Sequence, residues 1–206
     1  MDDELPRLVA AGKVTSVTGR WQRHCGARYA GAALDGRIGD GRWGTRTGFP
    51  VLYLGHPLDS VIVEAYRHLI DPIEDDDERA ALTQNLAPRA LVTATVSVTN
   101  ILDLRDVRTR AELHLTADVL RCPTNDTDGY AACQHVAQVA HQLGLHGILA
   151  PAATDRGQTL ALFTDLLPAG ERPTRDEPDQ MWNGLPADPR QSAAAQLRIV
   201  RDPRST

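Results

Sequence analysis

The sequence predicts a mixed α+β fold. Residues 91–99 alternate apolar and polar side chains with period two, whereas residues 129–143 show helical apolar spacing. Strands and helices do not alternate in a regular rhythm, which argues against a doubly wound parallel sheet. With 206 residues, of which 42% are hydrophobic, the chain is large enough for one domain with its own core.

The N-terminal third is expected to hold short elements. Residues 5–12 read as a helix that has Pro6 in its first turn and stops at Gly12. Residues 21–50 are rich in glycine and arginine and lack a long periodic segment, so short strands and loops are expected there. Residues 51–54 form an apolar strand candidate, and 57–69 have the apolar spacing of a helix that begins at a proline.

The rest of the chain predicts further elements. The acidic run within 72–80 is expected to be a solvated loop or a helix start. The helices and strands expected after it are a strand at 91–99, a helix at 110–121, a helix at 129–143 closed by Gly144, and strands at 147–150 and 159–163.

Three parts are expected. They are a helical extension over residues 1–20, a catalytic domain over 21–168, and an appendage over 169–206 that packs on the domain or on a partner. Proline and charge become frequent after residue 168, so 168–190 is expected to be irregular, with some order regained at 192–200.

Charge and hydropathy restrict the classes of partner. The net charge of −5 does not favour nucleic acid or an anionic membrane surface. No apolar run reaches the roughly 18–20 residues that a membrane span needs, and the acidic N-terminus lacks the features of a signal peptide. The three cysteines match no zinc or redox motif, and His135 and His141 have the wrong spacing for a metal pair. A cytoplasmic location without a metal is therefore expected.

Residues 21–53 reverse the charge of the chain. Five arginines oppose two aspartates there, in the company of glycines and large aromatic side chains. Guanidinium groups bind phosphate oxygens, glycines let backbone N–H groups approach an anion, and aromatic faces stack on rings. The segment therefore predicts a site for a phosphorylated, ring-containing ligand. The alternative is a solvated arginine-rich loop with structural aromatic residues.

Glu64 adds a carboxylate to this segment. It lies on the expected 57–69 helix beside apolar neighbours, so it must be paired or hydrogen-bonded to avoid a desolvation cost. A boundary glutamate paired with Arg67 is one interpretation. The other is a fixed negative charge of the kind that an oxocarbenium-like transition state requires.

Several motifs together resemble the RES domain, the family of toxins in Xre–RES toxin–antitoxin pairs. The resemblance covers about residues 21–168. It depends on motifs in a fixed order: Arg28-Tyr29 after Trp21, Gly41-Arg42-Trp43, Pro50-Val51-Leu52-Tyr53-Leu54, Glu64, the stretch 130–134 and the stretch 146–152.

The resemblance implies a fold similar to ADP-ribosyltransferases, with mixed, mostly antiparallel sheets and flanking helices around a cleft. It also implies the degradation of NAD. NAD would be a substrate whose nicotinamide–ribose bond is cleaved with phosphate or water as acceptor, and no prosthetic group is implied. The implied partner is an Xre-type antitoxin that occludes the cleft in a homo- or hetero-oligomer. Two alternatives remain: transfer of ADP-ribose to a macromolecule, or a weakly active module that binds NAD or the antitoxin.

The resemblance also implies roles for single residues. Glu64 and Arg28 match the glutamate and the arginine of the family, and Arg28 and Tyr29 join Glu64 as catalytic candidates. Ligand contacts are implied for Arg28, Tyr29, Arg42, Trp43 and Tyr53. The serine of the family falls on Ala131, or on Ala152 in the other alignment, so its hydroxyl is missing. Gln134, one helical turn after Ala131, is the candidate for a replacing hydrogen bond.

Overall fold

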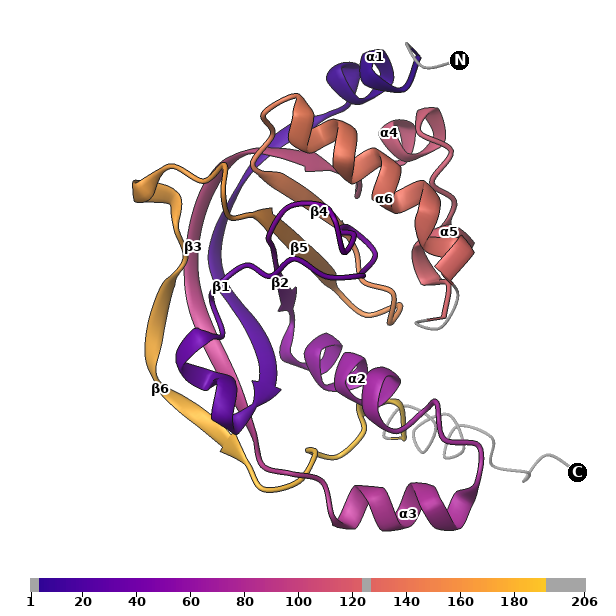
Figure 1. Cartoon of the computed structure of the whole chain (residues 1–206), viewed down its shortest axis with the longest axis vertical. Coiled ribbons are helices and arrows are strands. Elements are labelled where there is room, and N and C mark those ends of the chain that lie inside the picture. Colours follow the sequence, from indigo (N-terminus) through magenta and orange to yellow (C-terminus); the bar gives the residue numbers. More distant parts are fainter. Residues whose placement is uncertain (1–3, 124–126, 192–206) are drawn as a thin grey trace, which may run out of the picture.

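Five strands close into a barrel, and a sixth extends its edge (Figure 1). The computed structural model describes residues 4–123 and 127–191. The closed order is β1-β2-β5-β4-β3, and the barrel closes because β3 also pairs with β1. Strand β6 pairs with the first half of β3, whereas β4 pairs with its last residues. Five of the six strand pairings are antiparallel, and only β3 and β4 run parallel. The predicted mixed, mostly antiparallel α+β fold is confirmed, but the sheet is closed.

The described helices and strands follow one another along the chain. In order they are α1 (Glu4–Ala11), β1 (Val14–Gly26), the 3-10 helix η1 (Ala27–Ala32), β2 (Val51–His56), α2 (Leu58–Leu69), α3 (Asp76–Gln84), β3 (Arg89–Asp103), α4 (Val107–Glu112), α5 (Ala117–Arg121), α6 (Thr127–Gln142), β4 (Gly147–Pro151), β5 (Gln158–Phe163), the 3-10 helix η2 (Ala169–Glu171) and β6 (Thr174–Trp182).

The barrel closes at a single residue pair. Strand β1 pairs with β3 along nearly its whole length, but it meets β2 only where Gln22 faces Gly55. In an antiparallel register the next positions would be Arg23 opposite Leu54, and the two strands are not paired there. The strands therefore diverge beyond this closure, and the candidate site lies in the gap between them.

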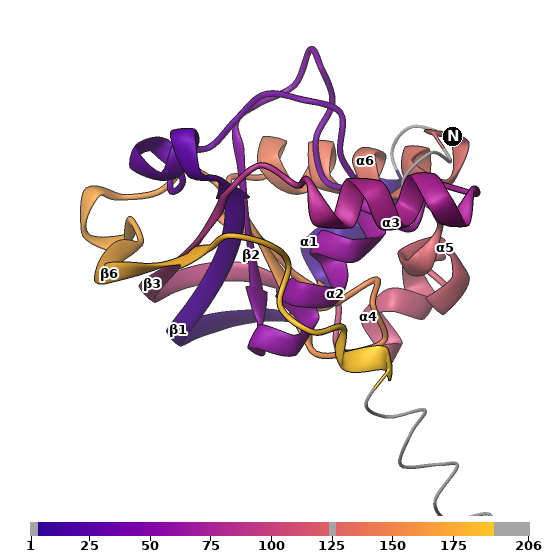
Figure 2. The same ribbon diagram turned by 90° about the horizontal axis from the view of Figure 1, so that it is seen from below.

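Side chains alternate between the two faces of each strand, so the barrel has an apolar layer on its inner face and another on its outer face. The inner face of the barrel contributes one buried cluster, which includes Trp21, Leu52 and Val96. The outer face is covered by α1, α5 and α6 in a second cluster, which includes Phe163 and Cys133. Viewed from below, the α-helices lie mostly to one side of the strands (Figure 2). None of the helices in the described ranges has the length and apolar character that a membrane span requires.

Most of the predicted elements are confirmed. The helices expected at 5–12, 57–69 and 129–143 are α1, α2 and α6, and the four expected strands are β2, β3, β4 and β5. The acidic run becomes the start of α3, whose first turn is capped by Asp75. The single helix expected at 110–121 is instead two helices. His114 has a φ of 55° after the end of α4, and Thr116 caps α5.

The secondary structure expected at the two ends of the catalytic domain is wrong. Residues 14–20 are not a helical extension but the first half of β1, in which an irregularity between Thr15 and Val17 interrupts the period-two pattern. Residues 174–182 are not irregular but form β6, an edge strand. Most β6 side chains are at least partly exposed, so its sequence carries no apolar alternation. The order expected at 192–200 lies outside the described residues.

Candidate active site

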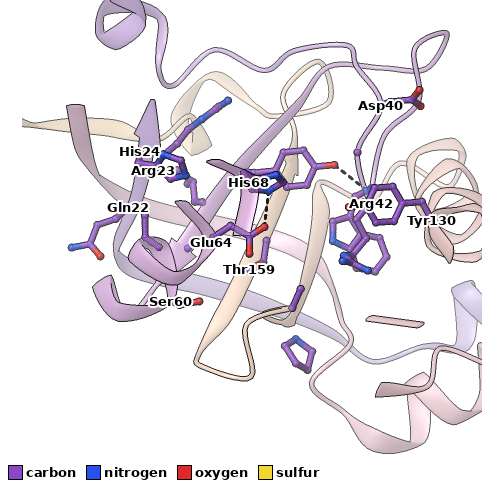
Figure 3. A pocket seen from close by; sticks show the side chains of 18 residues that line it. Gln22, Arg23, His24, Asp40, Arg42, Ser60, Glu64, His68, Tyr130 and Thr159 are labelled. Atoms are coloured by element: carbon purple, nitrogen blue, oxygen red, sulfur yellow. Dashed lines mark hydrogen bonds and ion pairs between the residues drawn. The ribbon is translucent and has the colours of Figure 1, made fainter. Parts of the chain in front are cut away.

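A cavity of about 440 Å³ lies where β1 and β2 diverge (Figure 3). Its walls are the end of β1, the 40–43 loop, the end of β2, one side of α2 and Tyr130 of α6. The volume is in the range of small-molecule sites. Segments that are far apart in the sequence thus meet at one cavity, and each brings a different chemical group.

Glu64 supplies the carboxylate at this cavity. Helix α2 is anchored by its buried apolar side chains, which turns Glu64 and His68 to the cavity. Glu64 Oε1 lies 2.8 Å from His68 Nε2, and Oε2 lies 3.8 Å from Arg67 Nη1. Burial raises the pKa of Glu64, but the hydrogen bond and charge of His68 and the charge of Arg67 outweigh it. The pKa of Glu64 is therefore below its ordinary value, and the side chain is a carboxylate at neutral pH.

Tyr53 holds the glycine-rich loop against the cavity. Its hydroxyl accepts a hydrogen bond of 2.9 Å from the backbone N–H of Trp43, whose side chain is fully buried in the core. A Cβ added at Gly41 would lie 2.8 Å from the Tyr53 hydroxyl, so the loop approaches that closely only with glycine there. Burial raises the pKa of Tyr53, which is therefore a neutral phenol. Trp43 thus anchors the loop through its buried ring, and both Trp43 and Tyr53 form part of the wall.

Arg42 connects this loop to the end of α5. Its Nη1 donates to the carbonyl of Val119 at 2.9 Å and to the Cys122 sulfur at 3.2 Å, and its Nη2 donates to the carbonyl of Cys122 at 3.1 Å. The guanidinium also lies 4.9 Å from the centre of the Tyr130 ring. These contacts occupy most of its donors, so the Nη1–Nη2 fork that binds a phosphate is not free. Its positive charge nevertheless remains in the cavity wall.

Arg23 and His24 line the cavity, although neither was predicted to have a role there of its own. Arg23 is one of the five arginines of the 21–53 segment. The half-buried Arg23 donates from Nη1 to the carbonyl of Ala33 at 3.1 Å. Burial, followed by the charge of Arg37, lowers the pKa of Arg23. The sequence does contain a signal for Arg23. In a strand, residues two positions apart share a face, so Arg23 lies on the same face of β1 as the buried Trp21.

His24 is held as a neutral imidazole. Its Nδ1 lies 3.2 Å from Arg89 Nε and 3.0 Å from Arg89 Nη2, and its ring stacks on Trp182 at 6.3 Å. Burial, followed by the charge of Arg89, lowers the pKa of His24 to about 3. Since a guanidinium is only a donor, Nδ1 must be the acceptor, and the proton of the neutral ring is on Nε2.

Arg28 and Tyr29 do not line this cavity. Both lie on η1 at a neighbouring cavity that shares Arg23 and His24 with the first, and Arg28 lies 4.6 Å from the centre of the Tyr29 ring. The resemblance to the RES domain made them catalytic candidates together with Glu64. The chain leaves β1 and forms η1 from Ala27, however, so Arg28 and Tyr29 line the neighbouring cavity instead.

Gln134, the candidate for replacing the hydrogen bond of the missing serine, does not line this cavity. The amide nitrogen of Gln134 donates to the carbonyls of Gly41 at 3.0 Å and Gly44 at 3.2 Å, so the side chain supports the loop from behind. Ala131 is exposed and Ala152 is buried, and neither lines the cavity. The cavity does have aliphatic hydroxyls, those of Ser60 and Thr159. No cluster of potential metal ligands occurs in 4–123 and 127–191.

Comparison with known proteins decides the family. The family described as RES domain matches residues 20–183 of the chain. The chain belongs to the RES domain family. The matched range begins within β1 and ends just after β6, so it covers the second half of β1 and all of the other strands. The resemblance inferred from the sequence motifs is thereby confirmed.

Curated relatives of this RES domain include the NAD(+) phosphorylases MbcT of Mycobacterium bovis and Mycobacterium tuberculosis. Each is 27% identical over 172 residues, which cover 77% of this chain and 83% of the relative. Among solved structures, the M. tuberculosis MbcT–MbcA toxin–antitoxin complex contains a chain with the same fold. Its TM-score is 0.71 at 23% identity, and the match covers 96% of this chain and 98% of that one.

Proposed function

We propose that this RES domain is a toxin that cleaves the nicotinamide–ribose bond of NAD, with inorganic phosphate as the acceptor. The observation that carries the proposal is the ionised Glu64 carboxylate at a cavity whose other walls present arginines and aromatic rings. The names of the relatives support it, because MbcT is an NAD(+) phosphorylase. NAD is then a substrate, and the proposal includes no prosthetic group.

Glu64 acts on the charge that develops as the bond breaks. The C1′–N bond of NAD breaks with its electron pair moving to the ring nitrogen, so nicotinamide leaves as a neutral molecule. The ribose is left with oxocarbenium character, and a fixed carboxylate stabilises that positive charge. A phosphate oxygen then bonds to the same carbon, which is C1″ in the numbering of ADP-ribose, so the products are nicotinamide and ADP-ribose 1″-phosphate. His68 and Arg67 keep Glu64 ionised for this role.

The other cavity residues bind and orient the substrate. The Tyr53 hydroxyl accepts from Trp43, which leaves its own proton for a ribose or amide oxygen. His24 presents Nε2–H as a neutral donor, so it adds no positive charge near the leaving pyridinium. The arginines Arg23 and Arg42 make the wall attractive to phosphate oxygens.

We also propose a protein partner. By analogy with the MbcT–MbcA complex, an Xre-type antitoxin would cover the cavity in a hetero-oligomer and block NAD entry. The shared chemistry of breaking the nicotinamide–ribose bond leads us to propose an ADP-ribosyltransferase-like site, acting in the cytoplasm.

The test is nicotinamide release from NAD by the purified chain, with and without inorganic phosphate. We expect release that accelerates with phosphate and falls by about 100-fold or more in Glu64→Gln, since the amide keeps the shape but loses the charge. Glu74→Gln is the matched control because Glu74 is exposed and does not line the cavity.

The remaining outcomes contradict the proposal in different ways. Release that is indifferent to phosphate would indicate a glycohydrolase. Label carried from NAD onto a macromolecule would indicate a transferase. NAD binding without release in the unaltered chain would indicate a binding module.

A further inference from the structure

The chain continues past the end of β6 and passes along α2 (Figure 2). We call residues 182–190 the C-terminal strap. The match to the RES domain family ends at residue 183, so most of the strap lies beyond the range that the family model covers. The mechanism proposed above gives the strap no role.

The start of the strap packs on α2 through apolar side chains. Trp182 is buried in a cluster with Ile62 of α2 and Leu91 of β3, and the partly buried Leu185 packs against the same cluster. The Trp182 ring also stacks on His24 of β1, with the two ring centroids 6.3 Å apart. The start of the strap therefore joins α2 to both β1 and β3.

Polar contacts attach the rest of the strap to the second half of α2. The Tyr66 hydroxyl donates to the carbonyl of Pro186 at 2.9 Å. Arg190 donates from Nη1 to Asp71 Oδ2 at 2.6 Å and from Nη2 to Asp71 Oδ1 at 3.0 Å. Asp71 is itself tied to the last turn of α2, because its backbone N–H donates to the Tyr66 carbonyl at 2.9 Å. The strap is thus fastened to α2 at several points along the helix.

Asp188 orients Arg190 for this contact. The buried Asp188 accepts from the backbone N–H of Arg190 at 2.9 Å, and its two carboxylate oxygens lie 3.0 Å and 2.9 Å from Arg190 Nε. One guanidinium therefore binds two carboxylates, and the hydrogen bonds to Asp71 and Asp188 raise the pKa of Arg190. Neither an amide nor an ammonium group reproduces this planar, two-pronged contact.

The strap and the active-site cavity lie on different faces of α2. Ile62 and Tyr66 contact the strap, whereas Ser60, Glu64 and His68 line the cavity. Glu64 is two residues from both Ile62 and Tyr66, and two residues turn about 200° around an α-helix. Residues 182–190 are all described by the structure, and none of them lines the cavity. The strap therefore supports α2 from behind Glu64.

This support acts where strand pairing is missing. Glu64 lies on α2, which follows β2, whereas His24 lies on β1. Strand β1 meets β2 only where Gln22 faces Gly55, so strand hydrogen bonds do not fix the separation of the two walls beyond that pair. Trp182 contacts both walls, since it packs with α2 and stacks on His24.

We propose that the C-terminal strap positions α2, and with it the Glu64 carboxylate, against the β1 wall of the active site, with Arg190 as the principal positioning residue. The proposal rests on the proposed function only for the role of Glu64. A carboxylate that stabilises a developing charge must be held where that charge appears, and a misplacement of about 1 Å can lower the rate by about 100-fold.

The experiment measures hydrogen exchange and nicotinamide release on the same preparations of the full chain. The variants are Arg190→Gln, Asp71→Asn and the double variant. The matched control is Arg20→Gln, which removes an exposed arginine that pairs with Asp176 of β6 at 2.9 Å and does not line the active-site cavity. Circular dichroism identifies a temperature at which every variant is folded, and peptides from α6 serve as the internal reference for exchange.

We expect the backbone amides of α2 to exchange about tenfold faster in Arg190→Gln than in the control, with exchange in α6 unchanged. The kcat for nicotinamide release should fall about tenfold, while KM stays within about twofold because the strap does not touch the cavity. The acid limb of the pH profile should not move, since Glu64 and His68 lie on the same helix and move together.

Asp71→Asn should reproduce these changes. The double variant should show no further fall in kcat, because both substitutions remove the same contact.

Equal exchange of α2 in Arg190→Gln and in the control would overturn the proposal. Faster exchange with an unchanged kcat would also overturn it, because the strap would then stabilise α2 without positioning Glu64. If the unaltered chain releases no nicotinamide, the proposed function fails and exchange decides about the strap. Faster exchange around Glu64 in Arg190→Gln then supports the proposal, whereas faster exchange confined to the end of α2 near Asp71 contradicts it.

Discussion

Glu64 and His68 face the same cavity from successive turns of α2, with Oε1 of the glutamate 2.8 Å from Nε2 of the histidine. The i,i+4 spacing puts the two side chains on one face of the helix. Burial alone raises the pKa of Glu64, and His68 is the main contributor that lowers it. The histidine therefore positions Glu64 and keeps it ionised.

This relationship predicts a change in the pH profile. In His68→Gln the pKa of Glu64 should rise, since burial then acts with less opposition. The acid limb of nicotinamide release should move to higher pH, while the rate well above that limb changes less. Steady-state rates measured between pH 4 and 8 check this, with His135→Gln, an exposed histidine on α6, as the control. An unmoved acid limb would show that His68 does not set the ionisation of Glu64.

The same pair has a consequence for stability. A glutamate whose pKa is lowered on folding stabilises the folded chain above its ordinary pKa of 4.5 and loses that contribution as the pH falls through the lowered value. The free energy of unfolding of His68→Gln should therefore differ most from that of the unaltered chain above pH 4.5, and the difference should shrink in acid. Urea denaturation at several pH values measures it.

His24 predicts a second pH dependence of stability. Its folded pKa of about 3 is below its ordinary 6.5, so between these values the unfolded chain binds a proton that the folded chain does not. The free energy of unfolding should fall as the pH decreases from 6.5 toward 3, and His24→Gln should remove that part of the slope. A slope identical in His24→Gln and the unaltered chain would argue against a neutral His24. Chemical denaturation curves measured across this pH range give the slopes.

Tyr53→Phe should destabilise the glycine-rich loop. The change leaves the N–H of Trp43 without its acceptor next to a fully buried side chain, a loss of about 1–3 kcal/mol. For a chain of this size, each kcal/mol lowers Tm by roughly 2–4 °C. Calorimetry of the variant measures the shift, and an unchanged Tm would mean that water replaces the phenol as the acceptor.

Gln134→Ala should weaken substrate binding more than it slows the chemical step. Its amide donates to the carbonyls of Gly41 and Gly44, so its loss frees the loop that carries Arg42 without touching Glu64. We expect a higher KM for NAD with a smaller change in kcat. Gln138→Ala, one turn further along the same helix and exposed, is the matched control. Equal KM values for the two variants would show that the loop does not need this support.

Local patterns determined a large part of the fold. Strand β3 was visible in the sequence because its buried and exposed side chains alternate from Val92 to Thr99, and α2 was visible from its apolar spacing. Strands β1 and β6 were missed. The first contains an irregularity between Thr15 and Val17 that breaks the alternation, and the second is an edge strand whose side chains mostly do not pack in the core. Closure of the barrel depends on one pair, Gln22 with Gly55, which no local pattern encodes.

By itself, the sequence determined the family, the expected chemistry and the selection of Glu64, because these depend on residue types in a fixed order along the chain. Only the tertiary structure decided which arginines share the cavity with Glu64. Because η1 follows β1, Arg28 and Tyr29 line the neighbouring cavity, and Arg23 and His24 line both cavities. The physical reason is that a cavity is formed where strands diverge, so its walls depend on register and closure between segments far apart in the sequence.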